Sequence, residues 1–223
     1  MNEIKIQERN HEELEAKIFE ILATKGPANT TMDLLARQLS MSKRTLYEIF
    51  GSKDDMIRTI MQHVHQEYSK MIAEIIRTSS NVMETMANIL LYQQKMISRL
   101  SKDFFVDMDR KYSQLRPEYD SGSQKWSTYI RQAIETGVKQ GVFREDANYD
   151  IIIPLFRVQM ESLKRIEELF PPGITIGEAY NAISLGFLRS IANRKGMEIL
   201  ESMSSKFTSS LLPDQSQQPT TCN

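Results

Sequence analysis

The sequence predicts an all-α protein, and three observations support that prediction. Apolar residues recur at steps of three and four along most of the chain, which is the spacing of amphipathic helices. Glycine and proline are sparse, with nine and seven among 223 residues, so few positions break a helix. Alternating apolar and polar runs bounded by turn residues, which are typical of strands, are hard to find.

Composition narrows the class of protein before any motif is considered. The chain is 40% hydrophobic and 26% charged, which allows a buried core. It has no apolar run of about 18 residues and no signal-like start, so we expect no membrane segment. The formal net charge is −1, so any contact with nucleic acid must come from a local basic patch. The single cysteine, Cys222, forms no disulfide framework and suits a reducing, cytoplasmic location.

Four helices are predicted in the first 80 residues from the residues that start and stop them. Serine and threonine are good N-caps, whereas glycine and proline end helices. Thr30-Thr31-Met32-Asp33 resembles a capping box with a shorter acid than the usual glutamate. The predicted helices are 7–25, a short helix that follows Thr31 and includes Leu39, a second short helix from Ser42 to Gly51, and a long helix over about 52–79 that begins with Ser52-x-x-Asp55.

Beyond residue 80, the apolar spacing predicts a larger helical region. Residues 82–113 are expected to form one or two helices, with an interruption near Ser101. Later helices are predicted over 124–140, 147–170, 176–195 and 197–207, and Gly196 is expected to end the third of these. The polar segment 208–223 is predicted to be a disordered tail.

The two short helices are the feature that points to a function. Two short helices joined by a tight turn form a helix-turn-helix, whose second helix lies in the major groove of DNA. At about 100° per residue, placing Leu46 inward also places Ile49 and Phe50 inward. Arg44 and Glu48 then point most directly outward.

The outward side chains are of the types that read base edges. Arg44 suits guanine, Glu48 can accept from the amine of cytosine, and the methyl group of Thr45 suits thymine. Lys43 and Tyr47 can reach phosphates or bases.

Charge near this helix supports the same interpretation. Residues 37–53 contain Arg37, Lys43, Arg44 and Lys53 against Glu48 alone, a local charge of +3. Lys53 also lies at the start of the next helix, where free backbone N–H groups favour a phosphate. The alternative is a surface helix whose polar face is merely solvated.

The stretch TTMDLLARQLSMSKRTLYEIFGSKDDMI closely resembles the DNA-binding segment of the TetR family of transcriptional regulators. The chain matches the family pattern, in register, at Gly26, Thr31, Leu35, Ala36, Ser42, Thr45, Leu46, Tyr47, Phe50, Ser52, Lys53, Asp54 and Met56. It departs from that pattern at Ser40-Met41, where the family often has Gly-Val. It also departs at Arg44, where a small residue is common, and at Ile49, where His or Tyr is usual. Arg44 and Glu48 therefore indicate that the protein has an operator of its own.

The resemblance implies which residues contact a double-stranded DNA operator. The candidates are Thr31, Ser42, Lys43, Arg44, Thr45, Tyr47, Glu48 and Lys53. It also implies a homodimer closed by a four-helix bundle from 147–170 and 176–195. The candidate interface residues are Phe156, Met160, Leu163, Ile183, Phe187 and Ile191. Such apolar stripes can equally form an intramolecular core.

The resemblance further implies a small-molecule effector, whose binding to the larger domain would release a repressor from its operator. The chain has 13 methionines, and flexible Met and aromatic side chains suit an adaptable apolar pocket. The candidate lining residues are Met86, Tyr92, Met96, Phe104, Phe105, Met108, Trp126, Tyr129 and Met160. Each of them can instead simply fill a helical core.

These predictions divide the chain into a helix-turn-helix domain at 1–51, a connecting helix at 52–80, a ligand-binding and dimerisation domain at 81–207, and the tail. A competing function is an architectural or adaptor protein whose larger domain binds a protein partner. We expect no enzyme, catalytic residue, metal or cofactor. His63 and His65 lie on different sides of a helix, and His11 has no second histidine four residues on.

Overall fold

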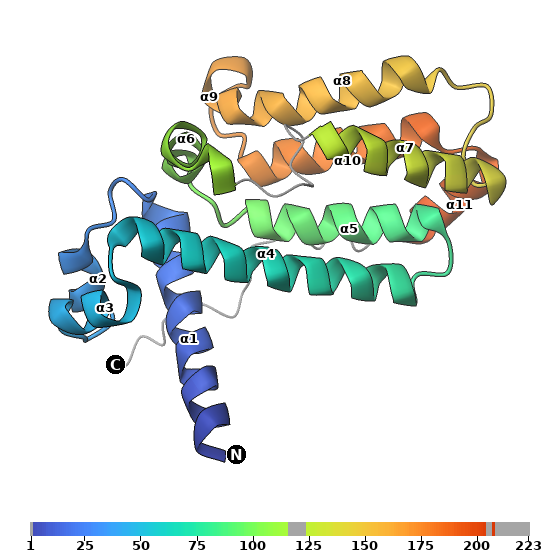
Figure 1. The fold of residues 1–223 in the computed structure, drawn as a ribbon. Coiled ribbons are helices and arrows are strands. Elements are labelled where there is room, and N and C mark those ends of the chain that lie inside the picture. The colour runs from blue at the N-terminus through green and yellow to red at the C-terminus, as the bar shows by residue number, and fades with distance from the viewer. Residues whose placement is uncertain (1, 116–123, 204–206, 208–223) are drawn as a thin grey trace, which may run out of the picture. The chain divides into compact units, whose positions relative to one another are not determined.

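The computed structural model describes residues 2–115, 124–203 and 207, and within them the all-α prediction is confirmed. The only extended pairing among these residues is an isolated bridge between Phe143 and Ala192. The helices are α1 (Asn2–Lys25), α2 (Met32–Gln38), α3 (Lys43–Phe50), α4 (Lys53–Thr78), α5 (Val82–Ile97), α6 (Lys102–Lys111), α7 (Gln124–Lys139), α8 (Tyr149–Ser162), α9 (Ile166–Leu169), α10 (Ile176–Ile191) and α11 (Arg194–Ser202), with 3-10 turns η1 (Ser113–Leu115) and η2 (Leu163–Arg165) (Figure 1). The segment 208–223, predicted to be a disordered tail, lies outside the described residues.

The described residues form two compact units. The first comprises the described parts of Met1–Arg77 and Arg99–Trp126, and the second those of Thr78–Ser98 and Ser127–Asn223. The sequence analysis predicts domain bounds at 51, 80 and 207. In the structure each unit consists of two separate segments, because α6 groups with the N-terminal unit while α5, which precedes it, groups with the second.

The start of α2 differs in detail from the predicted capping box. Thr31 is the N-cap, and its side chain accepts the N–H of Leu34 at 3.1 Å. Asp33 therefore lies one position too early to complete a capping box that begins at Thr31. Thr30 has a different role, because its hydroxyl is buried and donates to the carbonyl oxygen of Gly26 at 2.8 Å.

The predicted helix over 147–170 is interrupted in the structure. α8 ends at Ser162, and the chain passes through η2 before the single turn of α9. The apolar spacing alone could not locate this break, because side chains three residues apart, such as the buried Leu163 and Ile166, share a side in a 3-10 turn as they nearly do in an α-helix. By contrast, the predicted interruption near Ser101 is confirmed, since Ser101 is the N-cap of α6.

Gly196 does not end a helix, contrary to the sequence prediction. α10 already ends at Ile191, and the side chain of Asn193 starts α11 by accepting the N–H of Gly196 at 3.0 Å. A Cβ atom at Gly196 would lie 2.1 Å from the carbonyl oxygen of Val142. This glycine therefore permits a close approach of two backbones inside the second unit.

The N-terminal unit has one hydrophobic core, built by α1 to α4 and α6. Its buried members are Ile18, Leu22, Met32, Leu35, Leu46, Phe50, Met56, Ile57, Ile60, Met61, Phe104, Met108 and Tyr112. Burying a large apolar side chain of this kind contributes about 1.5–3 kcal/mol. The short helices α2 and α3 could not be stable alone, so this shared core holds them in place.

A buried carboxylate joins α1 to α4 in the same unit. Glu15 is only 5% exposed, and its two oxygens lie 3.2 Å from His11 Nε2 and 3.4 Å from His63 Nδ1. The His11 ring also stacks on Phe50, with centroids 6.0 Å apart. These partners compensate the burial of the carboxylate. Among the described residues, no three Asp, Glu, His or Cys side chains are grouped in a way that could hold a metal ion.

The second unit is a helical bundle in which α10 packs on α5 and α8. The rings of Phe156 on α8 and Phe187 on α10 stack in parallel, with centroids 3.8 Å apart. A full capping box begins α10, because Thr175 and Glu178 each bond to the backbone N–H of the other.

The turn after α1 packs closely against the start of α6. The N–H of Ser101 donates to the carbonyl oxygen of Ala23 at 2.7 Å, and the amide of Asn29 donates to Asp103 at 3.0 Å. Gly26 has a φ of +79°, and a Cβ atom there would lie 2.7 Å from the Cβ of Asp103. Only glycine fits this position without strain.

We therefore expect Gly26→Ala to destabilise the protein more than Gly51→Ala does. Both glycines have positive φ, but the nearest atom to a Cβ at Gly51 is 3.8 Å away. The left-handed conformation costs each alanine variant about 1–2 kcal/mol, and crowding adds about 1–3 kcal/mol only at Gly26. Thermal unfolding followed by circular dichroism measures the difference. Equal losses in the two variants would contradict the close packing of the turn on α6.

Candidate nucleic-acid interface

Caps at both ends determine where α3 begins and ends. At its start, the hydroxyl of Ser42 accepts the N–H of Thr45 at 3.0 Å. At its end, Gly51 adopts a φ of +74° and donates its N–H to the carbonyl oxygen of Tyr47 at 2.9 Å. Both boundaries agree with those predicted from the sequence.

The turn between α2 and α3 contains a non-glycine residue in the left-handed region. Ser40 has a φ of +53°, and the next N–H, that of Met41, returns to the carbonyl oxygen of Ala36 at 2.9 Å. Glycine adopts a positive φ without steric cost. This accounts physically for the glycine that the TetR pattern often has at this position.

The rotation of α3 agrees with the prediction except at one residue. Leu46 is fully buried and Phe50 nearly so, whereas Arg44 and Glu48 are exposed on the opposite side. Ile49 was expected to face inward, and that expectation is wrong, since it is 40% exposed. At about 100° per residue, Ile49 lies about 60° from Leu46 and Phe50 only about 40° on the other side. The core covers the Phe50 side and leaves Ile49 at the edge.

The two cations of α3 are each paired with a carboxylate. Arg44 Nε donates to Glu48 Oε1 at 2.8 Å, and Lys43 Nζ donates to Asp33 Oδ2 at 2.9 Å. The hydrogen bond and negative charge of Asp33 raise the pKa of Lys43. Both cations are exposed, and the paired carboxylates partly compensate the positive charge of the patch.

Among the candidates that carry a hydroxyl group, some cap helices, whereas Tyr47 lies on the outer face of α3. Thr31 and Ser42 cap α2 and α3, and the hydroxyls of Ser42 and Thr45 are 2.7 Å apart. Tyr47 is 43% exposed beside Lys43 on the outer face. The caps position the helices, and their contacts with DNA stay predictions.

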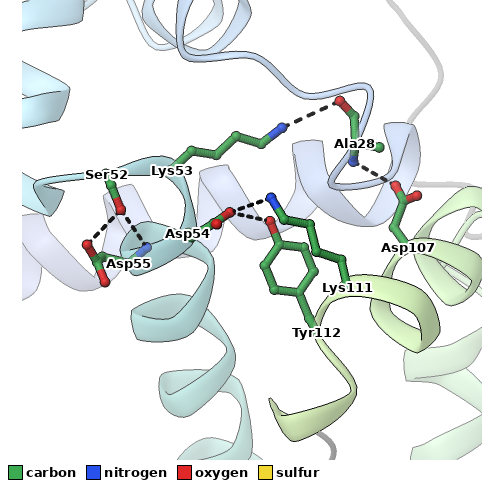
Figure 2. Close-up of polar contacts among 8 residues, drawn as sticks. All are labelled: Ala28, Ser52, Lys53, Asp54, Asp55, Asp107, Lys111 and Tyr112. Atoms are coloured by element: carbon green, nitrogen blue, oxygen red, sulfur yellow. Dashed lines mark hydrogen bonds and ion pairs between the residues drawn. The ribbon is translucent and has the colours of Figure 1, made fainter.

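Lys53 is directed toward its own protein (Figure 2). Its Nζ lies 3.4 Å from the carbonyl oxygen of Ala28, which precedes α2. Burial lowers the pKa of Lys53, and the nearby positive charge of Lys111 lowers it further. Its neighbour Ser52 caps α4 by accepting the N–H of Asp55 at 3.1 Å, as predicted. A phosphate contact would require Lys53 to exchange the carbonyl oxygen of Ala28 for a phosphate oxygen.

Residues of α6 and its C-terminal end contact the segments on either side of the helix-turn-helix, as Figure 2 shows. Asp107 accepts the N–H of Ala28 at 2.6 Å. Asp54, in the first turn of α4, accepts from Tyr112 Oη at 2.6 Å and from Lys111 Nζ at 2.8 Å. These two hydrogen bonds hold the pKa of Asp54 below its ordinary value, and burial raises that of Tyr112.

The sequence analysis does not find these α6 contacts. Asp103 and Asp107 are four residues apart and therefore share a helix face, which is the one available signal. Their partners lie more than 70 residues earlier in the chain. Spacing within α6 cannot identify such partners.

The candidate ligand-lining residues are divided between the two units. Phe104 and Met108 lie in the hydrophobic core of the N-terminal unit, beside Leu22 and Ile57. Tyr129 is exposed in the second unit. The first unit also holds Phe105 and Trp126, and the second also holds Met86, Tyr92, Met96 and Met160. The core interpretation therefore describes Phe104 and Met108 best, and the pocket itself stays a prediction.

Most of the candidate dimer-interface residues are buried inside their own unit. Phe156, Leu163, Phe187 and Ile191 are each less than a tenth exposed, so their side chains are buried within the second unit. Met160 and Ile183 are partly exposed. The stripes that the sequence shows on these helices are thus largely intramolecular packing.

A different face of α8 exposes its apolar side chains. Ile151, Leu155 and Val158 are each more than half exposed and share one side of the helix. On α10, the small residues Ala182 and Gly186 are exposed four positions apart. A large apolar stripe and a small-residue stripe are complementary surfaces for helix packing.

The architecture defines the class of protein. A short helix with capped ends, a buried apolar side and outward cations follows a second short helix across a tight turn, which is a helix-turn-helix of the DNA-binding kind. Residues 16–60 match the family model described as bacterial regulatory proteins, tetR family. The helix-turn-helix region of this chain is therefore similar to that of the TetR family of transcriptional regulators.

A curated relative shows the same similarity. An uncharacterised helix-turn-helix transcriptional regulator of Bacillus subtilis, YvaF, is 32% identical over 77 residues, which are 34% of this chain and 40% of that protein. The match therefore spans less than half the length of this curated relative.

Solved structures with low identity share the fold. One is a proposed transcriptional regulator from Saccharomonospora viridis in complex with choline, at a TM-score of 0.64 and 19% identity, covering 84% of this chain and 100% of that one. Another is the ketosteroid transcriptional regulator KstR2 of Mycobacterium tuberculosis, at a TM-score of 0.57 and 18% identity, covering 83% and 96%. In the part of the chain that the structure describes, no helix is long and apolar enough to cross a membrane.

Proposed function

We propose that this protein is a homodimeric repressor that binds a specific DNA operator through α3 and is released by a small-molecule effector. The observation that carries the proposal is the fixed rotation of α3. Leu46 and Phe50 are held in the core, so Arg44 and its neighbours face outward from a rigid helix. Rigid presentation of an arginine and a tyrosine suits direct reading of base edges in the major groove.

Operator affinity would come from phosphate contacts and specificity from base contacts. Lys43 and Tyr47 flank the outer face of α3 and can reach the sugar–phosphate backbone. Arg44 lies at the centre of that face, where base edges are nearest. The match to the TetR family model supports a sequence-specific role for the helix, since the matched region includes all of α2 and α3.

The homodimer is proposed to form through the exposed faces of α8 and α10. In a two-fold dimer both copies use the same surface patch. A stripe of large apolar side chains on α8 of one copy can therefore pack on a stripe of small residues on α10 of the other copy. Ile151, Leu155 and Val158 supply the first stripe, and Ala182 and Gly186 the second. Such a dimer would present two α3 helices to half-sites about one DNA turn apart, about 34–36 Å.

The effector is proposed from the fold and its neighbours. One structural neighbour is in complex with choline and another is named a ketosteroid transcriptional regulator, which supports a small-molecule effector for a protein of this fold. Within the N-terminal unit, α6 is bonded to the turn before α2 and to the first turn of α4. A ligand that moves α6 would therefore shift α3, and a coupling of about 1–3 kcal/mol would weaken operator binding measurably.

We expect wild-type protein to select a two-fold symmetric site from random duplex DNA at one stated salt concentration. Arg44→Ala should relax the preference at one base pair in each half-site, with a loss of about 1–3 kcal/mol. Sequencing of the bound DNA after several rounds measures both results. Binding without sequence enrichment would contradict the proposed function and favour an architectural protein that contacts only the DNA backbone.

Leu155→Glu should separate the dimer and remove binding to the symmetric site. The substitution places a charge in an apolar interface twice, once for each copy. Ile76→Glu is the matched control, because Ile76 is equally exposed, at 58% against 57%, but lies on α4. Analytical ultracentrifugation gives the oligomeric state. A dimer that tolerates Leu155→Glu, or a wild type that is monomeric, would contradict this interface and favour a protein partner for the α8 stripe.

A further inference from the structure

Arg44 has an unusual environment for an outward side chain of α3. It is 89% exposed, yet its Nε is held by Glu48 Oε1 at 2.8 Å, one helical turn away. Within the described residues, its two terminal nitrogens, Nη1 and Nη2, have no hydrogen-bond partner. The guanidinium is thus fixed on one side and open at its end.

The open end has the geometry that guanine requires. Guanine offers two acceptors in the major groove, O6 and N7, and arginine satisfies both with two parallel N–H groups. When Nε is occupied by a carboxylate, the Nη1 and Nη2 atoms are the pair that remains. The planar guanidinium makes this division of donors possible, because its N–H groups point in fixed directions.

We propose that Glu48 is a positioning residue that holds Arg44 for end-on, two-bond recognition of a guanine in each operator half-site. This inference rests on the proposed function. It adds that the recognised base is guanine and that Glu48 prepares Arg44 to recognise it. It is an alternative to the direct contact of Glu48 with cytosine that the sequence predicts, and it rests on the hydrogen bond that the Glu48 carboxylate accepts from Arg44 within the protein.

The proposal has two consequences of opposite sign. Fixing a long side chain before binding reduces the conformational entropy that Arg44 loses on DNA, which favours the guanine site. The carboxylate itself is repelled by phosphates, so it weakens binding to every DNA sequence. Glu48 therefore lowers general affinity while it raises discrimination. A residue that only stabilised the helix would not produce this combination.

The test compares Glu48→Ala and Glu48→Gln with wild type on three duplexes at one salt concentration. These are the selected site, the same site with the Arg44-dependent guanine replaced, and an unrelated sequence. Glu48→Ala should lower discrimination between the first two by about three- to tenfold, the range for one ordered side chain. It should also bind the unrelated duplex more tightly. Glu48→Gln should fall between, because its amide oxygen can still accept from Arg44 Nε.

Asp33→Asn is the matched charge control. Asp33 is also an exposed carboxylate paired with a cation of α3, in this case Lys43. Its neutralisation should strengthen binding to all three duplexes and leave the guanine preference unchanged. Glu48 is exposed on a helix and alanine is a good helix former, so Glu48→Ala should fold normally.

Three results would overturn the inference. Full guanine discrimination in Glu48→Ala would show that Arg44 needs no positioning. Loss of preference at a separate C·G pair, with the guanine preference intact, would show that Glu48 reads cytosine directly. Failure of the wild type to select any site would remove the proposed function as well, and this outcome is recognised in the wild-type experiment alone.

Discussion

Burial of Leu46 and Phe50 in the N-terminal core is the constraint on which the proposed DNA interface depends. α3 is too short to be stable by itself, so its rotation is set by what it buries. A shift by one residue would turn the helix by about 100° and move Arg44 away from the centre of the outer face. The caps at Ser42 and Gly51 set the length of the helix, and the core determines its orientation.

A second constraint joins this interface to α6. The turn around Gly26 packs so closely on Asp103 that a side chain would not fit, and Asp107 satisfies the N–H of Ala28 in the same turn. At the other end of α6, Asp54 accepts from Lys111 and Tyr112. The helix-turn-helix is therefore part of a larger unit that includes α6, which is bonded to the segments before and after that motif.

The parts of the fold that the sequence predicted well depend on residues close together in the chain. The caps at Ser42 and Ser52, the break at Ser101 and the outward position of Arg44 all follow from contacts within about four residues. The strained turn at Ser40 was marked only as a departure from a family pattern. The prediction that Ile49 faces inward failed, because the exposure of this residue depends on which side of α3 the neighbouring helices cover.

Longer-range features could not be read from spacing. The apolar stripes on α8 and α10 were correct as stripes, but whether Phe156 and Phe187 face another copy or each other depends on the packing of the whole bundle. Likewise, the contact of Asp107 with Ala28 joins residues 79 positions apart. Sequence patterns show that a helix face is apolar or charged, and only the tertiary structure shows what that face meets.

The measurement that tests the central claim most directly is methylation interference on the selected operator. Dimethyl sulfate methylates guanine N7, which lies in the major groove, and adenine N3, which lies in the minor groove. If α3 reads the major groove through Arg44, methylation of one guanine in each half-site should block wild-type protein but not affect Arg44→Ala. Interference at adenine N3 alone, or an identical pattern for the two proteins, would contradict the account.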